Sequence, residues 1–371
     1  MVNIVESKPL MTQADYARKL RPLLPPEAFL PDQNYTWILL INLTILILGW
    51  GIADYLDRWH WYLLWLALPL ALVMGNSVMV LLFTTHNIMH SASIKNPWLK
   101  RAISLLGLTM LWMPPTLWKA VHNREHHNQT NSLQDPDRNY LAQQPKTWGK
   151  WIQNQFVPSA EVNPILLIIG MAHSWGVHCF RNLSSVFLFN NGSTKYPVCA
   201  FTVSPADRQA IGWELLLMIG LHISILTALD FHPIKLLLGY FLPIWIGHSG
   251  AMFYIYTNHM LCRMTSVNDP LVNSISLRVP KIFDVLHLNF SYHTEHHIFP
   301  GMNSDYYPLV QELLQTHYPD RFNLLDAGKV WQLMLQTPRH YLDENTFTDW
   351  TRTKSVSCPL SADWSLRKSK I

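Results

Sequence analysis

Residues 61–90 read WYLLWLALPLALVMGNSVMVLLFTTHNIMH, an apolar run that leads directly into a pair of histidines. The part at 61–83 contains no charged residue. It is long enough for a helix that crosses the hydrocarbon core of a bilayer, which takes roughly 17–25 residues. His86 and His90 follow at positions i and i+4, so they share one face of a helix and can point at the same ion. This stretch therefore predicts a membrane helix that ends in two candidate metal ligands.

Three further apolar runs are long enough, or nearly so, to span a bilayer, and Glu214 is the only charged residue within them. They lie at 37–53, 211–229 and 236–256. Short turns at 54–60 and 230–235 join the four runs in pairs. The pattern predicts an all-α integral membrane protein with four transmembrane helices arranged as two hairpins.

The composition agrees with this reading. Of the 371 residues only 14% are charged, well below the roughly 25% typical of soluble domains, and 49% are hydrophobic. The mean hydropathy of +0.07 is nevertheless too low for a chain that lies wholly in the membrane. The composition thus excludes a disordered or collagen-like chain and indicates a few membrane helices with a large polar part outside the bilayer.

The Lys and Arg residues indicate the orientation. Of the 28, only Arg58 and Lys235 lie in the short turns, and the others lie before, between or after the two hairpins. Because Lys and Arg favour the cytoplasmic side, we expect both termini and the central segment there. We expect a cytoplasmic N-terminal segment at 1–35, a membrane domain at 36–347 and a polar, loose C-terminal tail at 348–371.

Two more histidine clusters follow the pair at 86 and 90. HNREHH stands at 122–127, and HTEHH stands at 293–297. Adjacent histidines on a helix diverge by about 100°, so each His-His pair suits two ions better than one. An HxxxH pair alone is more typical of packed core histidines, but three such clusters together indicate a metal centre. Imidazole binds zinc, copper, iron and nickel alike, so the ligand type leaves the metal open.

The metal centre and the positive charges predict the same topology. With four spans, all three clusters emerge on one side of the membrane, within a cytoplasmic helical cap. If the apolar stretch at 102–118 also crossed, the first two clusters would lie on opposite sides. We therefore place 102–118, and a similar stretch at 164–177, along the membrane surface or inside the protein.

The positions of the remaining histidines relative to the spans indicate their roles. His259 lies at the cytoplasmic end of the fourth span, level with the clusters, and is a ninth candidate ligand. His248 lies about 16 Å deeper on the same helix at 1.5 Å per residue, so we expect a buried polar residue or a channel lining there. For His173, His178 and His222 we favour ordinary structural roles.

The order HxxxH, HxxxHH and HxxHH around two hairpins resembles that of the integral-membrane fatty acid desaturase and hydroxylase superfamily. NFSYHTEHHIFPGM at 289–302 is similar to the third histidine box of its acyl desaturases, and HNREHHNQTNSLQDPD at 122–137 is similar to the second. The resemblance implies an O2-dependent enzyme that introduces a double bond into a fatty acyl chain. Hydroxylation, ketone or acetylenic bond formation and alkene-forming decarboxylation are alternatives within the superfamily.

The same resemblance implies a di-iron centre with O2 as co-substrate. The implied ligands are His86, His90, His122, His126, His127, His293, His296 and His297, with His259 as the additional histidine near the last span. Two positions depart from the pattern. Asn87 stands where many relatives have Asp, and Ile255 stands where the acyl-CoA branch has an Asn that helps to hold a water on iron.

An all-histidine ligand set would leave the irons highly charged, so nearby acids are candidates for counter-charge. The candidates are Asp135, Asp137, Glu125 and Glu295, although a solvated loop would explain each of them equally well.

Electrons must come from outside the chain. It has no HPGG-type haem-binding segment, and its four cysteines show no CxxC spacing. We expect an external donor such as ferredoxin or a b-type cytochrome, steered by the net charge of +4 if it is acidic. The other expected partners are membrane lipid and a fatty acyl substrate that is lipid-, CoA- or carrier-protein-linked or a free acid, with no nucleic acid.

Two alternatives come from other classes. His122-Asn-Arg-Glu125-His126 fits the inverted HxxEH motif of zinc proteases, with Glu125 as general base, but it leaves five of the clustered histidines without a role. A metal transporter would need ionisable residues within its spans, where only His222, His248 and Glu214 qualify.

Overall fold

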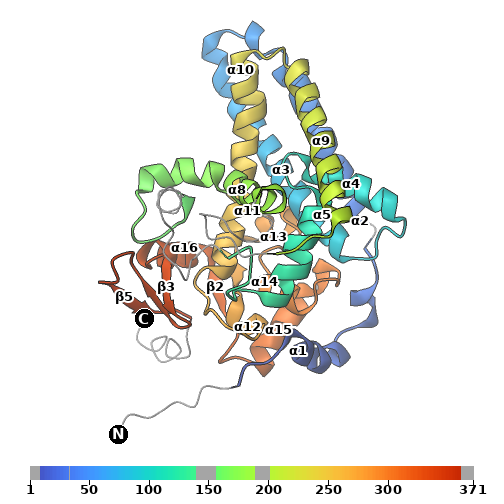
Figure 1. The fold of residues 1–371 in the computed structure, drawn as a ribbon. Coiled ribbons are helices and arrows are strands. Elements are labelled where there is room, and N and C mark those ends of the chain that lie inside the picture. Colours follow the sequence, from blue (N-terminus) through green and yellow to red (C-terminus); the bar gives the residue numbers. More distant parts are fainter. Residues whose placement is uncertain (1–8, 33, 139–155, 189–200, 361–371) are drawn as a thin grey trace.

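The computed structural model describes residues 9–32, 34–138, 156–188 and 201–360 (Figure 1). Within these residues, four helical segments have the length and composition to cross a membrane: Asn34–Arg58, Trp61–His90, Pro205–Ala228 and Pro233–His259. They rise from a wider body that holds the other elements (Figure 1). Each segment contains one of the four apolar runs, the third to within one residue at its end, so the predicted number of spans is confirmed for the described part of the chain.

The first two segments contain helices α2 (Asn34–Ala53) and α3 (Ala67–His90), joined through the short helices η3 (Leu56–Arg58) and η4 (Trp61–Leu66). Helix α3 packs against α2 on one side and against α11 (Leu242–His259) on the other. Two glycines permit the close approach of α3 and α11. A Cβ on Gly75 would lie 2.6 Å from Ile246, and one on Gly247 would lie 2.7 Å from Val78. This contact brings the histidine-bearing ends of α3 and α11 together, so that His86 and His259 line one small cavity.

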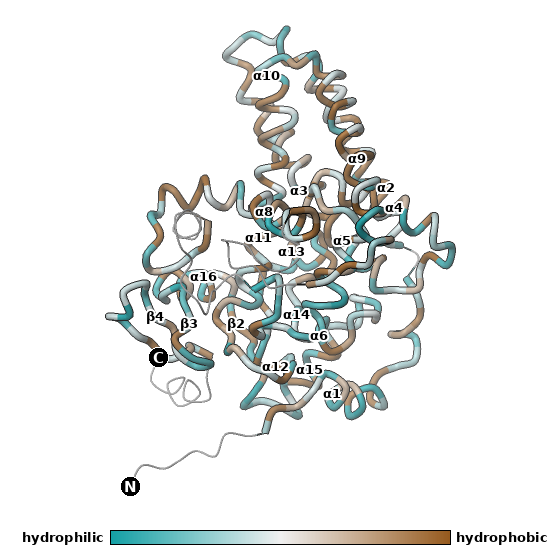
Figure 2. Tube along the Cα trace, viewed as in Figure 1, coloured by the Kyte–Doolittle hydropathy of each residue, from teal (hydrophilic) through white to brown (hydrophobic). Residues whose placement is uncertain are grey.

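The outer faces of these helices are apolar and uncovered. Only 28% of the most apolar window of Asn34–Arg58 is buried, and only 22% of that of Pro205–Ala228. The projecting helices are predominantly hydrophobic in Figure 2, while the body alternates between polar and apolar residues. Apolar surface of this extent marks contact with lipid, and the backbone groups inside it are satisfied within the helices. The protein is a membrane protein.

The third and fourth segments hold α9 (Pro205–Ala228), α10 (Pro233–Lys235), a π-helix η6 (Leu236–Phe241) and α11. At their turn the Lys235 ammonium group lies 2.8 Å from both Asp54 and Asp230 and 3.4 Å from Asp57. The lysine side chain is only 2% exposed. We name this group the turn cluster; it ties the turn after α9 to the turn after α2.

Both apolar stretches that we placed outside the spans are helical. The first forms α4 (Pro97–Thr109) and α5 (Pro115–Trp118), separated by a sharp turn at Trp112, where φ is 54°. The second forms α8 (Pro164–Phe187), which packs against α11 at the base of the projecting helices (Figure 1). Neither belongs to the four candidate spans of the described chain.

The body surrounds the inner ends of the spans. Its helices are α1 (Gln13–Leu20), η1 (Arg21–Leu23), η2 (Pro26–Phe29), the π-helix η5 (Lys119–His126), α6 (His127–Gln129), α12 (Pro270–Asn273), α13 (Lys281–Leu286), α14 (His293–Ile298), η7 (Ser304–Tyr306), α15 (Tyr307–His317) and α16 (Ala327–Gln336). Helix α1 packs against α14 through a core that includes Tyr16, Leu20 and Ile298.

The all-α prediction is wrong in one respect, because the body also contains two small sheets. Strand β1 (Ser276–Arg278) pairs in parallel with β2 (Leu324–Asp326). Strands β3 (His340–Asp343), β4 (Thr346–Thr348) and β5 (Ser355–Ser357) form an antiparallel sheet in that order. Each strand has only three or four residues, too few for alternation to appear in the sequence.

The predicted loose tail is also corrected as far as Leu360. Strand β5 pairs with β4, and Cys358 is buried, with its thiol donating to the carbonyl of Leu261 at 2.7 Å. A short strand paired with a buried neighbour is ordered by its backbone hydrogen bonds although its own side chains are exposed. The part of the tail at 361–371 lies outside the described residues.

Candidate metal centre

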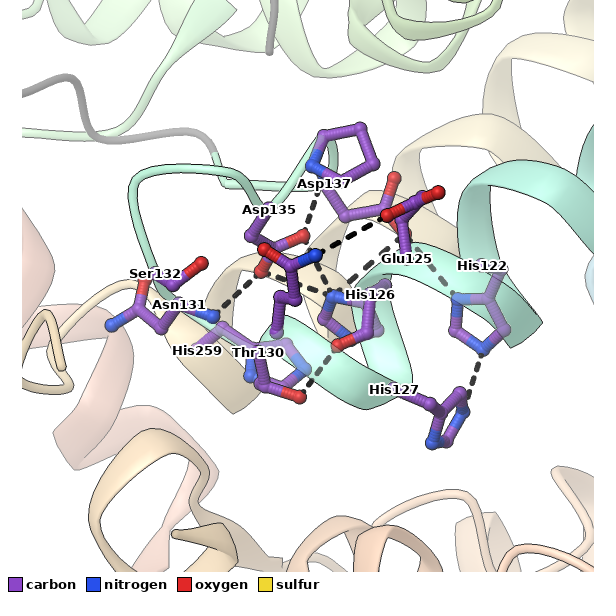
Figure 3. Close-up of polar contacts among 12 residues, drawn as sticks. His122, Glu125, His126, His127, Thr130, Asn131, Ser132, Asp135, Asp137 and His259 are labelled. Atoms are coloured by element: carbon purple, nitrogen blue, oxygen red, sulfur yellow. Dashed lines mark hydrogen bonds and ion pairs between the residues drawn. The ribbon is translucent and has the colours of Figure 1, made fainter. Parts of the chain in front are cut away.

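The first histidine cluster occupies the last turn and a half of α3, and the second lies on a helix of unusual geometry. Residues Lys119–His126 form a π-helix, whose hydrogen bonds join residues five apart. This geometry brings His122 and His127 together, with their Nε2 atoms 3.2 Å apart (Figure 3). A regular α-helix would have paired His122 with His126 instead. The π-helix therefore distributes the second cluster between two neighbouring sites.

The predicted histidines converge in two adjoining groups. In each group the candidate ligand atoms lie within 4.8 Å of one another. The five-histidine group consists of His86, His90, His122, His127 and His296. The four-histidine group consists of His126, His259, His293 and His297. All nine candidate ligands belong to one group or the other, and a third possible group combines His122 and His126 with Asp137.

The nitrogen atoms within the groups face one another rather than ordinary hydrogen-bond partners. The Nε2 atoms of His293 and His259 are 2.7 Å apart, and those of His296 and His127 are 3.2 Å apart. The Nε2 atoms of His86 and His90 are buried without a hydrogen-bond partner among the described residues. Buried polar atoms without partners are rare, and converging imidazole nitrogens suit a metal ion. The donor set therefore fits metal binding.

The protonation of these side chains also suits a ligand role. Burial lowers the pKa of most box histidines outside the spans well below its ordinary value, so these rings are neutral and keep a lone pair. These are His122, His127, His293, His296 and His297. Burial would also lower the pKa of His126, but the charges of Asp135 and Asp137 raise it overall.

Hydrogen bonds at Nδ1 orient several rings. His126 Nδ1 donates to the Asp135 carboxylate at 3.0 and 3.1 Å (Figure 3), and His259 Nδ1 donates to the carbonyl of Asn273 at 3.0 Å. His296 Nδ1 lies 3.1 Å from the Tyr307 hydroxyl. A proton held at Nδ1 fixes the tautomer and leaves Nε2 as the ligand atom.

The four candidate acids differ in position. Asp135 is buried against His126, and Asp137 lies 3.3 Å from His122 Nδ1, so a solvated loop is wrong for both. Burial raises the pKa of Asp137 to about 6. Glu295 is fully buried, with Ser276 and Gln311 as hydrogen-bond donors, and burial raises its pKa to about 7. Glu125 instead pairs with Arg124 at 2.8 Å. Only the two aspartates stand beside the ligand set.

A small cavity of about 30 Å³ lies between the two groups. Side chains from both groups reach it, and the rest of its wall is mostly apolar. It is lined by Leu82, His86, Trp118, His122, His126, Asp137, Trp175, His178, Ile255, His259, Phe290 and His293. Ile255, one of the two departures from the superfamily pattern, thus adds an apolar surface beside the four-histidine group.

One residue of this wall was missed by sequence reasoning. His178, for which we favoured an ordinary structural role, points its Nε2 atom toward Asp137 at a distance of 3.4 Å. It shares α8 only with His173, five residues earlier, and no spacing connects it to the three clusters, so the sequence carried no signal for it. The Nε2 atom of His248 lies 3.1 Å from the carbonyl of Met110, as expected for a buried polar residue.

His222 and His173 have the ordinary roles that we expected. His222 is buried between the carbonyl of Thr109 at 3.0 Å and the Tyr240 hydroxyl at 2.7 Å. His173 is exposed and contacts the carbonyl of Ile169 in its own helix at 2.8 Å.

Four apolar helices with a histidine-rich centre at their inner ends define a class of membrane metalloprotein. The family model for fatty acid desaturase matches residues 59–325 of this chain. The chain therefore belongs to the fatty acid desaturase family, whose members are oxidoreductases known for using two irons. No curated protein matches the sequence. Membership in this family also argues against the zinc protease and the metal transporter.

Proposed function

We propose that this protein is an O2-dependent membrane fatty acyl desaturase that acts with two irons. The observation that carries the proposal is the placement of nine histidines in two adjoining groups, both of which reach one largely apolar cavity. In the proposed reaction two hydrogen atoms leave neighbouring carbons of the acyl chain. A donor supplies two electrons, and O2 leaves as two molecules of water with two further protons.

The five-histidine and four-histidine groups would each hold one iron. When bound, the pair of irons supplies the oxidising power that an unactivated methylene requires, and the protein supplies position and electrostatics. Asp135 and Asp137 place negative charge beside the ligand set and so offset part of the positive charge of two ions. Neutral imidazoles add none.

The cavity wall supports an apolar substrate. Leu82, Ile255 and Phe290 exclude water from the space between the groups and offer no hydrogen bond that a polar substrate would need. A methylene pair fits such a wall by apolar contact alone. The wall thereby orients the chain against the two groups, and small shifts of the reacting carbon would decide between a double bond and a hydroxyl group.

An external electron donor completes the proposal. Ferredoxin or a b-type cytochrome would serve, and the net charge of +4 favours an acidic protein. We also propose that the metal centre and both termini face the cytoplasm, as the distribution of Lys and Arg indicates. A single cysteine introduced at Asp57 should then react with a membrane-impermeant maleimide from outside intact cells, and labelling only after lysis would overturn this orientation.

The function is tested with protein purified in detergent after growth with iron and zinc both available. About two irons per chain, together with a new unsaturated fatty acid when a donor and its reductase are supplied, would support the proposal. A hydroxylated product at the same iron content would replace desaturation by hydroxylation. Zinc without iron would overturn the oxidative function altogether.

A further inference from the structure

The C-terminal sheet β3–β5 lies beyond the residues that the family model matches, yet it reaches the metal centre. Its central contact is Tyr341 of β3, which is 2% exposed. The Tyr341 hydroxyl donates to the carbonyl of Cys262 at 2.7 Å and accepts from the Asn131 side-chain amide at 3.0 Å. The sheet therefore contacts both the loop after the second histidine box and the turn after α11.

Asn131 is the next link. It lies four residues after His127 and has a φ of 57°, a conformation that Asn tolerates better than most residues. Its side-chain amide also lies 2.8 Å from the carbonyl of Arg263. Its backbone N–H donates to Asp135 Oδ2 at 2.7 Å, and Asp135 in turn accepts from His126 Nδ1 (Figure 3). Every side chain of this path is at least nine-tenths buried.

A second path from the same sheet ends at the same group. Cys358, just after β5, donates from its thiol to the carbonyl of Leu261, while Tyr341 holds the carbonyl of Cys262. The N–H of Cys262 donates to the carbonyl of His259 at 3.0 Å. His126 and His259 both belong to the four-histidine group, so both paths end at one of the two groups.

We infer that the C-terminal sheet positions the four-histidine group: Tyr341 acts through Asn131 and Asp135 on His126, and through the turn 260–263 on His259. Tyr341 touches no ligand itself and is a positioning residue. A direct partner of a ring, such as Asp135, holds it in the orientation that binds metal, and loss of such a partner typically costs about 10–100-fold in metal affinity. Because Tyr341 acts through Asp135, we expect an effect at the lower end of this range. The inference rests on the proposed function only in that the two groups hold metal.

The test compares Tyr341→Phe with Tyr35→Phe. Tyr35 is also buried and also loses a hydroxyl with two hydrogen-bond partners, but both partner atoms belong to Ser304, and no hydrogen bond joins Ser304 to a box histidine among the described residues. Iron is removed from each purified holoprotein with a chelator and followed over time. We expect Tyr341→Phe to release one iron per chain about tenfold faster than the wild type, with the second iron unchanged and with Tyr35→Phe unaffected.

Mössbauer spectra of the iron-57 protein should show the change in one of the two iron sites only. Equal release from Tyr341→Phe and Tyr35→Phe, or a matching acceleration of both irons, would overturn the inference while the proposed function stands. If the wild-type protein bound no iron, both this inference and the proposed function would be overturned. If Tyr341→Phe does not fold, Asn131→Gly removes the side-chain amide that joins this loop to Tyr341, keeps the backbone N–H that donates to Asp135 and suits the positive φ; the same selective release is expected, and its absence counts against the inference.

Discussion

The two ends of the segment Pro233–His259 carry two polar clusters with opposite properties. At one end, the turn cluster surrounds Lys235 with three aspartates, so each charge meets an opposite charge. At the other end, the histidine groups direct imidazole nitrogen atoms at one another, and the Nε2 atoms of His86 and His90 find no partner within the described chain. The first cluster is complete by itself and ties two turns together. In the second cluster the converging nitrogen atoms need a cation as their partner. This difference distinguishes a structural cluster from a functional one.

The largest expected effect comes from removing a ligand. His296→Ala should abolish product formation and lower the iron content, because the five-histidine group loses a nitrogen that lies 3.2 Å from His127. The protein should still insert into the membrane, since His296 lies outside the four spans. Iron analysis and product assay are compared with His173→Ala, which removes an exposed histidine of α8. Normal turnover of His296→Ala would exclude it as a ligand.

A smaller effect is expected when a candidate ligand is retained but loses the hydrogen-bond partner that orients its ring. Asp135→Asn removes the carboxylate that accepts from His126 Nδ1, and the iron affinity of the four-histidine group should fall about 10–100-fold. The measurement is competition with a chelator of known affinity. Asp326→Asn, at an exposed carboxylate before α16, is the matched control. Unchanged affinity would show that the ring is held by its other contacts.

The turn cluster should respond in the opposite way. Lys235→Met removes the buried ammonium group that Asp54, Asp57 and Asp230 share, so the melting temperature should fall by a few degrees, solvent screening the remaining carboxylates. Iron per folded chain should stay at the wild-type value. Lys329→Met, an exposed lysine of α16, controls for the loss of one charge. If Lys235→Met lost iron but kept the wild-type melting temperature, the distinction between the two clusters would be wrong.

The smallest effect is expected at His248. It lies deeper in α11 than His259, and its Nε2 is occupied by the carbonyl of Met110 at 3.1 Å. His248→Ala should retain both irons and change only the preference for acyl chain length, which product profiles with a series of chain lengths would reveal. Loss of iron in this variant would show that the depth along the helix had been misjudged.

The sequence predicted the spans and the nine histidines because both depend on patterns within short stretches, namely apolar runs and fixed histidine spacings. It did not predict how the histidines divide between the groups, since the π-helix at Lys119–His126 has no sequence signature of its own. The contacts of His178 and Tyr341 were also out of reach. Both reach the centre from distant segments, and a single sequence carries no record of such pairings.

The π-helix has a consequence for how the centre can be lost. A π-helix corresponds to an α-helix with an additional residue accommodated in its turn. Deleting one residue between Trp118 and His122 would favour regular winding and rotate the three box-two histidines by about 100° against α5. Every histidine and the HxxxHH spacing would survive such a deletion, yet His122 and His127 would no longer face one site. The π-helical winding of Lys119–His126 therefore matters to this metal centre as much as the ligands themselves do.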